Sequence, residues 1–272
     1  MKFILLLLFC LSFSFNAYSQ GKIEESKKDV SKTERREKVR NKKKSSLIDG
    51  DDFFVSFFGN LAMQFFLYST YYTFIGDSSD EVHLSNNLAR YPYHNNSIGN
   101  YTEVNQETGK VKNIRLDVEN NFLFESPNLY GNHLKLNFRP VRQFSIGVDY
   151  FELLEQVNNG YSNLSLYNFN FNYDRLKFKK FNLGWNLGVN YIANEVQEAG
   201  ISVGFNTDVF LEKNFSLFGS FKWSEINDAP VNTYEMKIRY HKNRYFAAIG
   251  YEHLKIGRPT FNFLSMGAGV YF

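Results

Sequence analysis

Strict alternation of apolar and polar residues over Phe181–Ile192 is the feature that most constrains the fold of this chain. The stretch reads FNLGWNLGVNYI, with large apolar residues at every odd position and only Asn or Gly at the even positions before Ile192. A period of two residues predicts a β-strand, because successive side chains of a strand point to opposite faces. In a soluble β-sandwich the apolar face packs into a core. In a membrane barrel it faces lipid, and the polar face lines the interior.

Similar segments recur from Asn113 to the C-terminus and predict ten strands. In one of them Tyr234, Met236 and Ile238 alternate with Glu235 and Lys237. Leu164 and Leu166 are out of phase with the residues that follow them, which predicts a β-bulge. Short connections such as PVR and EKN alternate with longer ones such as ELLEQVNNG and SEINDAPVN. This alternation is typical of an up-and-down transmembrane barrel with both chain ends on one side.

The first residues of the chain, 1–19, predict a secretory signal peptide. Lys2 precedes an apolar run over Phe3–Phe13, and Ala17 and Ser19 form a small-x-small cleavage pattern. Cys10 is the only cysteine, and Phe9 stands before it where a lipidation signal requires a small residue. The mature chain therefore has no disulfide and no cysteine-ligated metal.

Residues 20–50 predict a basic, disordered tether. Lys22–Lys44 contains eleven Lys or Arg and five Asp or Glu and almost no apolar residues, while the whole chain has a formal charge of only +3. Contact of this tether with anionic lipid headgroups or peptidoglycan is the alternative to simple solvation. Nucleic acid is not an expected partner for an exported chain.

Residues 51–76 predict an aromatic-rich amphipathic helix. Phe53–Gly76 carries no charge, and Ser56, Asn60 and Gln64 recur every fourth residue. A helix packed on the barrel or lying in the membrane interface is favoured over two additional strands, which would make twelve, and over a membrane span. Residues 77–112 form an irregular polar segment, with a short hairpin as an alternative at its end.

Four features favour lipid around the apolar faces: export, strand length, Tyr and Trp near strand ends, and the C-terminal pattern. Reading back by twos from Phe272 gives Val270, Ala268, Met266 and Leu264. This resembles the C-terminal signal strand of bacterial outer-membrane β-barrel proteins, although Val270 stands where that class often has an aromatic residue. The resemblance covers Asn113–Phe272 in pattern. It implies outer-membrane lipid as the surroundings and recognition of Phe272 by the barrel-assembly machinery.

The polar faces predict a mostly closed, polar lumen, because a barrel of eight to ten strands is narrow enough for side chains to fill. Charges buried there must pair or be hydrated. The candidates for this luminal network are Arg115, Asp117, Glu119, His133, Lys135, Arg139, Asp149, Lys222, Glu235, Lys237, Arg239 and Glu252, with Asp208 and His241 as further members.

The sequence contains no recognisable catalytic motif. It has neither a G-x-S-x-G nor an H-E-x-x-H pattern, and Glu252 and His253 are strand neighbours that point to opposite faces. We therefore expect a non-enzymatic barrel without cofactor or metal, with a structural role or a binding role mediated by its loops. The alternatives are a membrane-embedded hydrolase acting on lipid or peptide, and a secreted soluble β-protein that binds a hydrophobic ligand.

Overall fold

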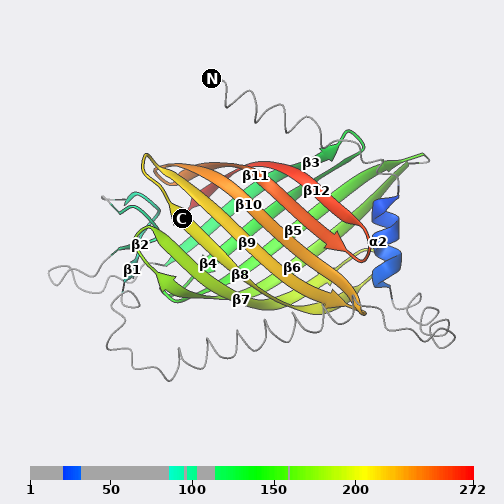
Figure 1. Ribbon diagram of the computed structural model, residues 1–272, viewed down its shortest axis with the longest axis horizontal. Helices are drawn as coiled ribbons and strands as arrows, with labels where there is room; N and C mark the ends of the chain where they lie inside the picture. Colours follow the sequence, from blue (N-terminus) through cyan, green and yellow to red (C-terminus); the bar gives the residue numbers. More distant parts are fainter. Residues whose placement is uncertain (1–20, 32–85, 95–96, 103–113, 159) are drawn as a thin grey trace.

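The chain forms a closed antiparallel barrel of ten strands (Figure 1). The computed structural model describes residues 21–31, 86–94, 97–102, 114–158 and 160–272. Each strand pairs with its neighbours in the sequence, and β12 pairs with β3 to close the ring. The strands are β3 (Arg115–Ser126), β4 (Leu129–Arg139), β5 (Phe144–Val157), β6 (Gly160–Lys177), β7 (Phe181–Ile192), β8 (Glu198–Phe210), β9 (Phe215–Ile226), β10 (Ala229–Lys242), β11 (Tyr245–Ile256) and β12 (Thr260–Tyr271). The predicted ten-stranded, up-and-down barrel is confirmed, with its first strand beginning at Arg115.

The connections between strands are short at both ends of the barrel, so the predicted alternation of short and long loops is wrong. We call one end the terminal mouth; its connections are residues 140–143, 178–180, 211–214 and 243–244. The other end is the hairpin mouth, with connections 127–128, 158–159, 193–197, 227–228 and 257–259. The segments expected as longer loops mostly continue the strands, so that β5 has 14 residues and β6 has 18.

The turn between β9 and β10 illustrates why such tight connections form. Asn227 and Asp228 have φ values of 53° and 64°. Positive φ at both central residues matches the right-handed twist of the flanking strands, and Asn and Asp tolerate this conformation.

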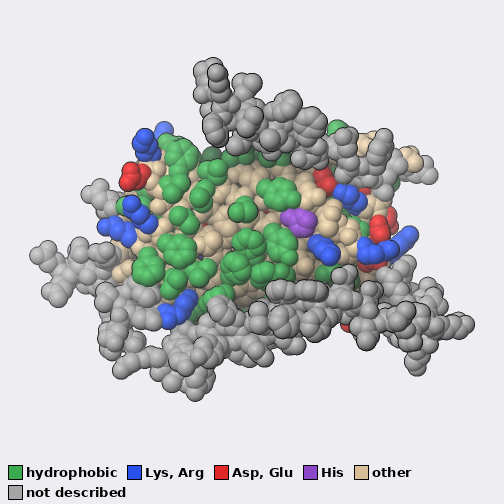
Figure 2. Space-filling view, viewed as in Figure 1, with side chains coloured by type: hydrophobic (Ala, Val, Ile, Leu, Met, Phe, Trp, Pro, Cys, Tyr) green, Lys and Arg blue, Asp and Glu red, His purple; other side chains and the backbone are tan. Residues whose placement is uncertain are grey.

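The outward face of the barrel is apolar (Figure 2). Leu187 is 39% exposed and Met236 is 61% exposed, and both occupy the apolar parity of their strands. Phe122, Ile146, Phe169, Phe171, Val189, Leu217, Ile238, Ile249, Leu264 and Met266 are exposed in the same way. A closed ring with apolar residues outward does not match a soluble sandwich, whose apolar faces would be covered by a second sheet.

At the hairpin mouth the interior becomes apolar, in a region that we call the apolar collar. Its members are Leu123, Leu129, Phe151, Leu153, Leu164, Leu166, Ile192, Val196, Ile226, Ala229, Val231, Leu254, Ile256, Phe261 and Phe263. The predicted bulge at Leu164 and Leu166 is wrong, because β5 and β6 keep one register from Phe144 to Val157. Leu164 and Leu166 are out of phase with the apolar residues after them because they face inward, whereas those residues face outward. The register shift of β6 lies instead between Asp174 and Leu176.

A nine-residue helix, α2 (Lys22–Val30), closes the collar. Ile23 and Val30 are seven residues apart, lie on one helix face and are fully buried among the collar residues. The expectation of a disordered tether is therefore wrong for this part of residues 20–50, because the two apolar residues have a buried surface to pack against. Residues 1–19, 32–50 and 51–76, with their predicted signal peptide, remaining tether and aromatic helix, lie outside the described residues.

Part of the predicted irregular segment 77–112 fills the terminal mouth. Its two-residue strands β1 (Asn87–Leu88) and β2 (Tyr101–Thr102) pair with each other, and Leu88 and Tyr101 are buried. The Tyr101 hydroxyl donates to the Arg142 carbonyl at 3.1 Å, and Asn86 Nδ2 donates to the Lys177 carbonyl at 2.8 Å. Within the described part of the chain, no helix has the length and apolarity needed to cross a membrane.

Candidate functional site

The interior between the two mouths holds a network of charged side chains that we call the charged layer. Its members are Glu119, His133, Lys135, Asp149, Lys222, Glu235, Lys237, Arg239 and Glu252. They come from β3, β4, β5, β9, β10 and β11, and β10 supplies three of them at alternate positions. Closure of the barrel brings these strands around one narrow space, which is why residues more than a hundred positions apart meet.

Lys237 stands at the centre of the charged layer. Its Nζ lies 3.1 Å from Glu119 Oε1, 3.1 Å from Glu235 Oε2 and 2.8 Å from Glu252 Oε1. The lysine and all three glutamates are nearly inaccessible to solvent. Such burial is tolerated because each charge has opposite charges at hydrogen-bonding distance.

Three further cations balance the negative charges of the layer. Lys135 Nζ lies 2.6 Å from Glu235 Oε2, and Arg239 Nη2 lies 2.6 Å from Glu119 Oε2. Lys222 binds Asp149. Four carboxylates are thus matched by four cations. Arg239 and Lys135 also lie over the ring of Phe218, at 4.0 Å and 4.6 Å from its centroid.

A second set of ion pairs lies towards the terminal mouth. Arg115 Nε is 2.6 Å from Asp117 Oδ1, and Arg139 pairs with Asp117 and Asp174. Asp174 was not among the sequence candidates. It follows the run of inward asparagines on β6 at the same parity, and that parity is the signal that would have identified it.

All twelve residues proposed for the luminal network lie on the inward parity of their strands, and Asp117 and Lys135 are the two that are only partly buried. Asp208 and His241 lie inward as well. Glu252 and His253 point to opposite faces, and His253 Nδ1 contacts Asn262 Oδ1 on the outside at 2.7 Å.

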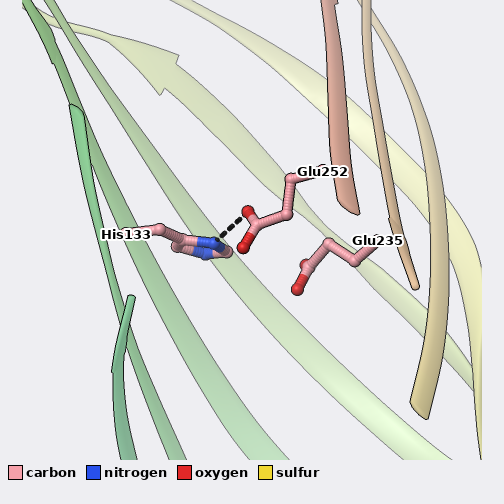
Figure 3. A group of neighbouring side chains, drawn as sticks. All are labelled: His133, Glu235 and Glu252. Atoms are coloured by element: carbon pink, nitrogen blue, oxygen red, sulfur yellow. Dashed lines mark hydrogen bonds and ion pairs between the residues drawn. The ribbon is translucent and has the colours of Figure 1, made fainter. Parts of the chain in front are cut away.

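The group formed by His133, Glu235 and Glu252 is the arrangement closest to a metal site (Figure 3). One potential ligand atom from each residue lies within 4.8 Å of the others, and His133 Nδ1 is 2.7 Å from Glu252 Oε2. The ammonium groups of Lys135 and Lys237, however, already bind the same two glutamates. A divalent cation added to this balanced set would stand beside two lysines, so the geometry favours an ion-pair network over a metal centre.

One serine–histidine contact and one serine–glutamate contact bear on catalysis. Ser216 Oγ lies 2.7 Å from His241 Nε2, and the Tyr271 hydroxyl lies 3.3 Å from His241 Nδ1. Ser265 Oγ donates to Glu252 Oε1 at 2.7 Å, and not to His133. Ser216, Ser265 and both histidines are buried. A serine nucleophile must reach its substrate and needs donors for the oxyanion, whereas these hydroxyls lie inside a paired β-barrel.

The opposite wall of the lumen, from β6, β7 and β8, consists mostly of Asn, Gly and Ser, with Asp174 and Asp208 towards the terminal mouth. We call its uncharged middle part the neutral wall. Asn186 lies opposite Gly204 and Asn206 lies opposite Gly184. A Cβ atom added to either glycine would come within 2.8 Å of the facing asparagine Oδ1. Glycine at these positions therefore leaves room for the asparagine side chains and, closer still, for the Asp174 carboxylate at Gly184 and the Phe221 carbonyl at Gly204.

The space left between the charged layer, the neutral wall and the terminal mouth is a cavity of about 100 Å³. Arg115, Asp149, Asn186, Asp208 and Arg239 are among its lining residues. A cavity of this size holds a few water molecules.

The chain resembles solved outer-membrane proteins at low identity. It matches Ail of Yersinia pestis at 11% identity, covering 59% of this chain and 100% of Ail, with a TM-score of 0.34. The N-terminal β-barrel domain of OprF from Pseudomonas aeruginosa matches at 9% identity, 58% and 96% coverage and a TM-score of 0.28. An outer membrane channel of Pseudomonas putida F1 matches at 6% identity, 63% and 100% coverage and a TM-score of 0.37. No family model and no curated protein matches the chain.

The class follows from the barrel itself. Ten antiparallel strands close without an edge, apolar side chains cover most of the outside, and the buried charged network lies inside. A closed barrel satisfies every backbone hydrogen bond within the sheet, as a lipid environment requires. In its architecture the chain is a transmembrane β-barrel protein.

Proposed function

We propose that this protein is a non-enzymatic, structural outer-membrane barrel whose lumen is closed and does not conduct. The observation that carries the proposal is the filled interior: the collar under α2, the charged layer and the residues 86–94 and 97–102 succeed one another along the barrel axis. A conducting barrel needs a continuous aqueous path, and a cavity of about 100 Å³ does not provide one.

Conductance across a planar lipid bilayer tests the closed lumen. We expect the purified full-length protein to insert without stepwise conductance, while an open general porin in the same bilayer serves as the positive control. Arg239→Gln and Lys237→Met, which each remove a positive charge from the charged layer, are measured in the same bilayer. Stepwise conductance by the unaltered protein would contradict the proposal.

We further propose that the chain is exported by residues 1–19 and assembled through its C-terminal strand. Phe272 exchanges backbone hydrogen bonds with Leu116 at 2.9 Å and 3.2 Å and keeps 66% of its surface exposed, so it is available to an assembly factor in an incomplete barrel. Deletion of Phe272 is expected to slow insertion into the outer membrane. Insertion at the unaltered rate would count against this role.

Absence of catalysis is supported by the burial of both luminal histidines. His133→Ala and His241→Ala would each abolish activity in a membrane-embedded hydrolase. We expect no hydrolysis of phospholipid or peptide substrates by the unaltered protein. Measured hydrolysis that is lost in either variant would establish the hydrolase instead. A binding role for the loops has less support, because the described connections contain few residues beyond the turns.

A further inference from the structure

The two ends of the barrel are closed by different parts of the chain. At the terminal mouth, the first and last barrel residues meet, with Phe272 N donating to the Leu116 carbonyl at 2.9 Å. Residues 86–94 and 97–102 lie in the same mouth, where Arg115 donates to the Ala89 carbonyl at 3.3 Å and to Asn100 Oδ1 at 2.9 Å. The chain therefore enters and leaves the barrel at one end.

Helix α2 occupies the other end (Figure 1). Every hairpin of the hairpin mouth contributes a contact to it. Lys22 pairs with Glu125 of β3 at 2.5 Å, Ser162 of β6 donates to Glu24, Lys27 pairs with Glu195 at 2.6 Å, Asn227 donates to the Val30 carbonyl at 2.8 Å, and Arg258 binds Asp29 through its backbone N and side chain at 2.9–3.2 Å.

A buried carboxylate of the barrel binds the N-terminus of α2. Glu155 is fully buried, and its two carboxylate oxygens accept from Lys22 N at 3.2 Å and from Ile23 N at 2.9 Å. The first N–H groups of a helix have no partner within the helix and favour a negative charge. A buried glutamate in this position, above a collar that receives Ile23 and Val30, is specific for a helix end.

The described side chains of the collar, the charged layer and the neutral wall occupy the lumen between the mouths, and a cavity of about 100 Å³ lies near the terminal mouth. Ser31 ends the segment at one mouth and Asn86 begins the segment at the other.

We propose that α2 and the C-terminal residue lie on opposite faces of the membrane. This inference rests on the proposed membrane location of the barrel. It places the N-terminal helix on the same face as all five hairpin turns, although the barrel begins and ends on the other face.

Accessibility of single cysteines to a membrane-impermeant maleimide tests the arrangement. Cys10 is the only native cysteine, so Cys10→Ser provides the background. Lys28→Cys reports on the exposed side of α2, Tyr161→Cys on the hairpin mouth and Arg244→Cys on the terminal mouth, and all three side chains are exposed. Each variant is labelled in intact cells and after permeabilisation of the outer membrane. Glu25→Cys is a second reporter on α2, and faster migration of unboiled samples in gels checks folding.

Lys28→Cys and Tyr161→Cys are expected to react under the same condition, and Arg244→Cys under the other. This comparison does not depend on which mouth faces the medium. Lys28→Cys reacting together with Arg244→Cys, and apart from Tyr161→Cys, would overturn the inference and leave the membrane barrel intact. Equal reaction of all three in intact cells, or in a soluble fraction, would remove the membrane location and with it the inference.

Discussion

The charged layer and the apolar collar are neighbours inside one barrel and are built from the same strands. The layer fills the interior with paired charges, whereas the collar fills it with apolar side chains. Along β5, the inward residues change from Asp149 to Phe151 and Leu153 within four positions. Along β10, Val231 belongs to the collar and Glu235 to the layer. His133 and Phe151 mark the boundary, with ring centroids 3.6 Å apart and nearly parallel planes.

The difference shows what each solution requires. Buried charges are stable only with partners at short distances, and the layer supplies them from strands all around the barrel. The collar needs no partners, but its open end would leave apolar surface in water at the mouth. Helix α2 covers that end. The collar therefore explains why a segment of largely charged sequence folds into a helix there.

The largest expected effect comes from breaking the charged layer at its centre. Lys237→Met leaves Glu119, Glu235 and Glu252 without their shared cation, and removing one partner of a buried ion pair costs about 3–5 kcal/mol. Urea unfolding of the reconstituted protein, followed by gel mobility of unboiled samples, measures it. Lys242→Met, exposed on the same strand, is the control. A second substitution, Glu252→Gln, should restore part of the stability. Equal stability of Lys237→Met and the control would refute the role of the layer.

Breaking the collar should cost almost as much, without a dependence on ionic strength. Leu254 is 1% exposed, and truncation of a buried leucine to alanine costs about 2–5 kcal/mol. The matched control is Ile249→Ala on the outward face of the same strand, where lipid can fill the space. Unfolding of both variants at two salt concentrations compares them. A cost for Leu254→Ala that vanishes at high salt would mean that the collar acts through the charges nearby.

The outer surface sharpens the comparison, because it is apolar like the collar but faces lipid. Leu187→Arg places a charge on that face and is expected to cost about 2–4 kcal/mol at the bilayer centre. Heat-modifiable gel mobility and membrane fractionation measure assembly, with Leu187→Phe as the control. Normal assembly of the arginine variant would show that this face does not contact hydrocarbon.

Weakening the contact between Glu155 and α2 should release this helix from the barrel. Glu155→Gln removes the negative charge that accepts from the first two N–H groups of the helix, and such charge-assisted hydrogen bonds contribute about 1.5–3 kcal/mol. We expect faster proteolysis at the lysines of α2, while the barrel keeps its heat-modifiable mobility. Glu152→Gln on the same strand is the control. Unchanged proteolysis of Glu155→Gln would mean that the Glu155 carboxylate does not hold the helix.

The smallest effect is a pH dependence of α2 docking. The hydrogen bond from Ser162, and Lys27 beside it, hold the pKa of Glu24 below its ordinary value of 4.5. A carboxyl with a lowered pKa in the folded state stabilises docking above its unfolded pKa, and this contribution is lost as the pH falls through the folded value. Because Glu24 is half exposed, the effect is expected to be below about 1 kcal/mol. Proteolysis of α2 at pH 7 and below pH 4, with Ser162→Ala as the comparison, measures it. Equal pH dependence in both proteins would exclude this contact as its source.

The strands and the charged layer could be predicted from the sequence because both depend on parity alone. Tyr234, Met236 and Ile238 had to share a face, and Glu235, Lys237 and Arg239 had to share the other, whatever the surroundings. The same parity placed Asp174 inside, although its neighbours Arg175 and Leu176 at the register shift obscured it. The collar was missed because Leu153, Leu254 and their neighbours were assigned to loops, so their inward parity was not followed to the strand ends.

What the sequence determined by itself is therefore the period of two residues, which specifies a barrel with one apolar and one polar face in its middle section. Only the tertiary structure decided which cation meets which carboxylate, because those partners lie on strands far apart in the chain and meet only when the ring closes. It also decided that Lys22–Val30 is a helix. Nine residues, six of them charged, are too few to form a stable helix alone, and they become one where Glu155 and the collar receive them.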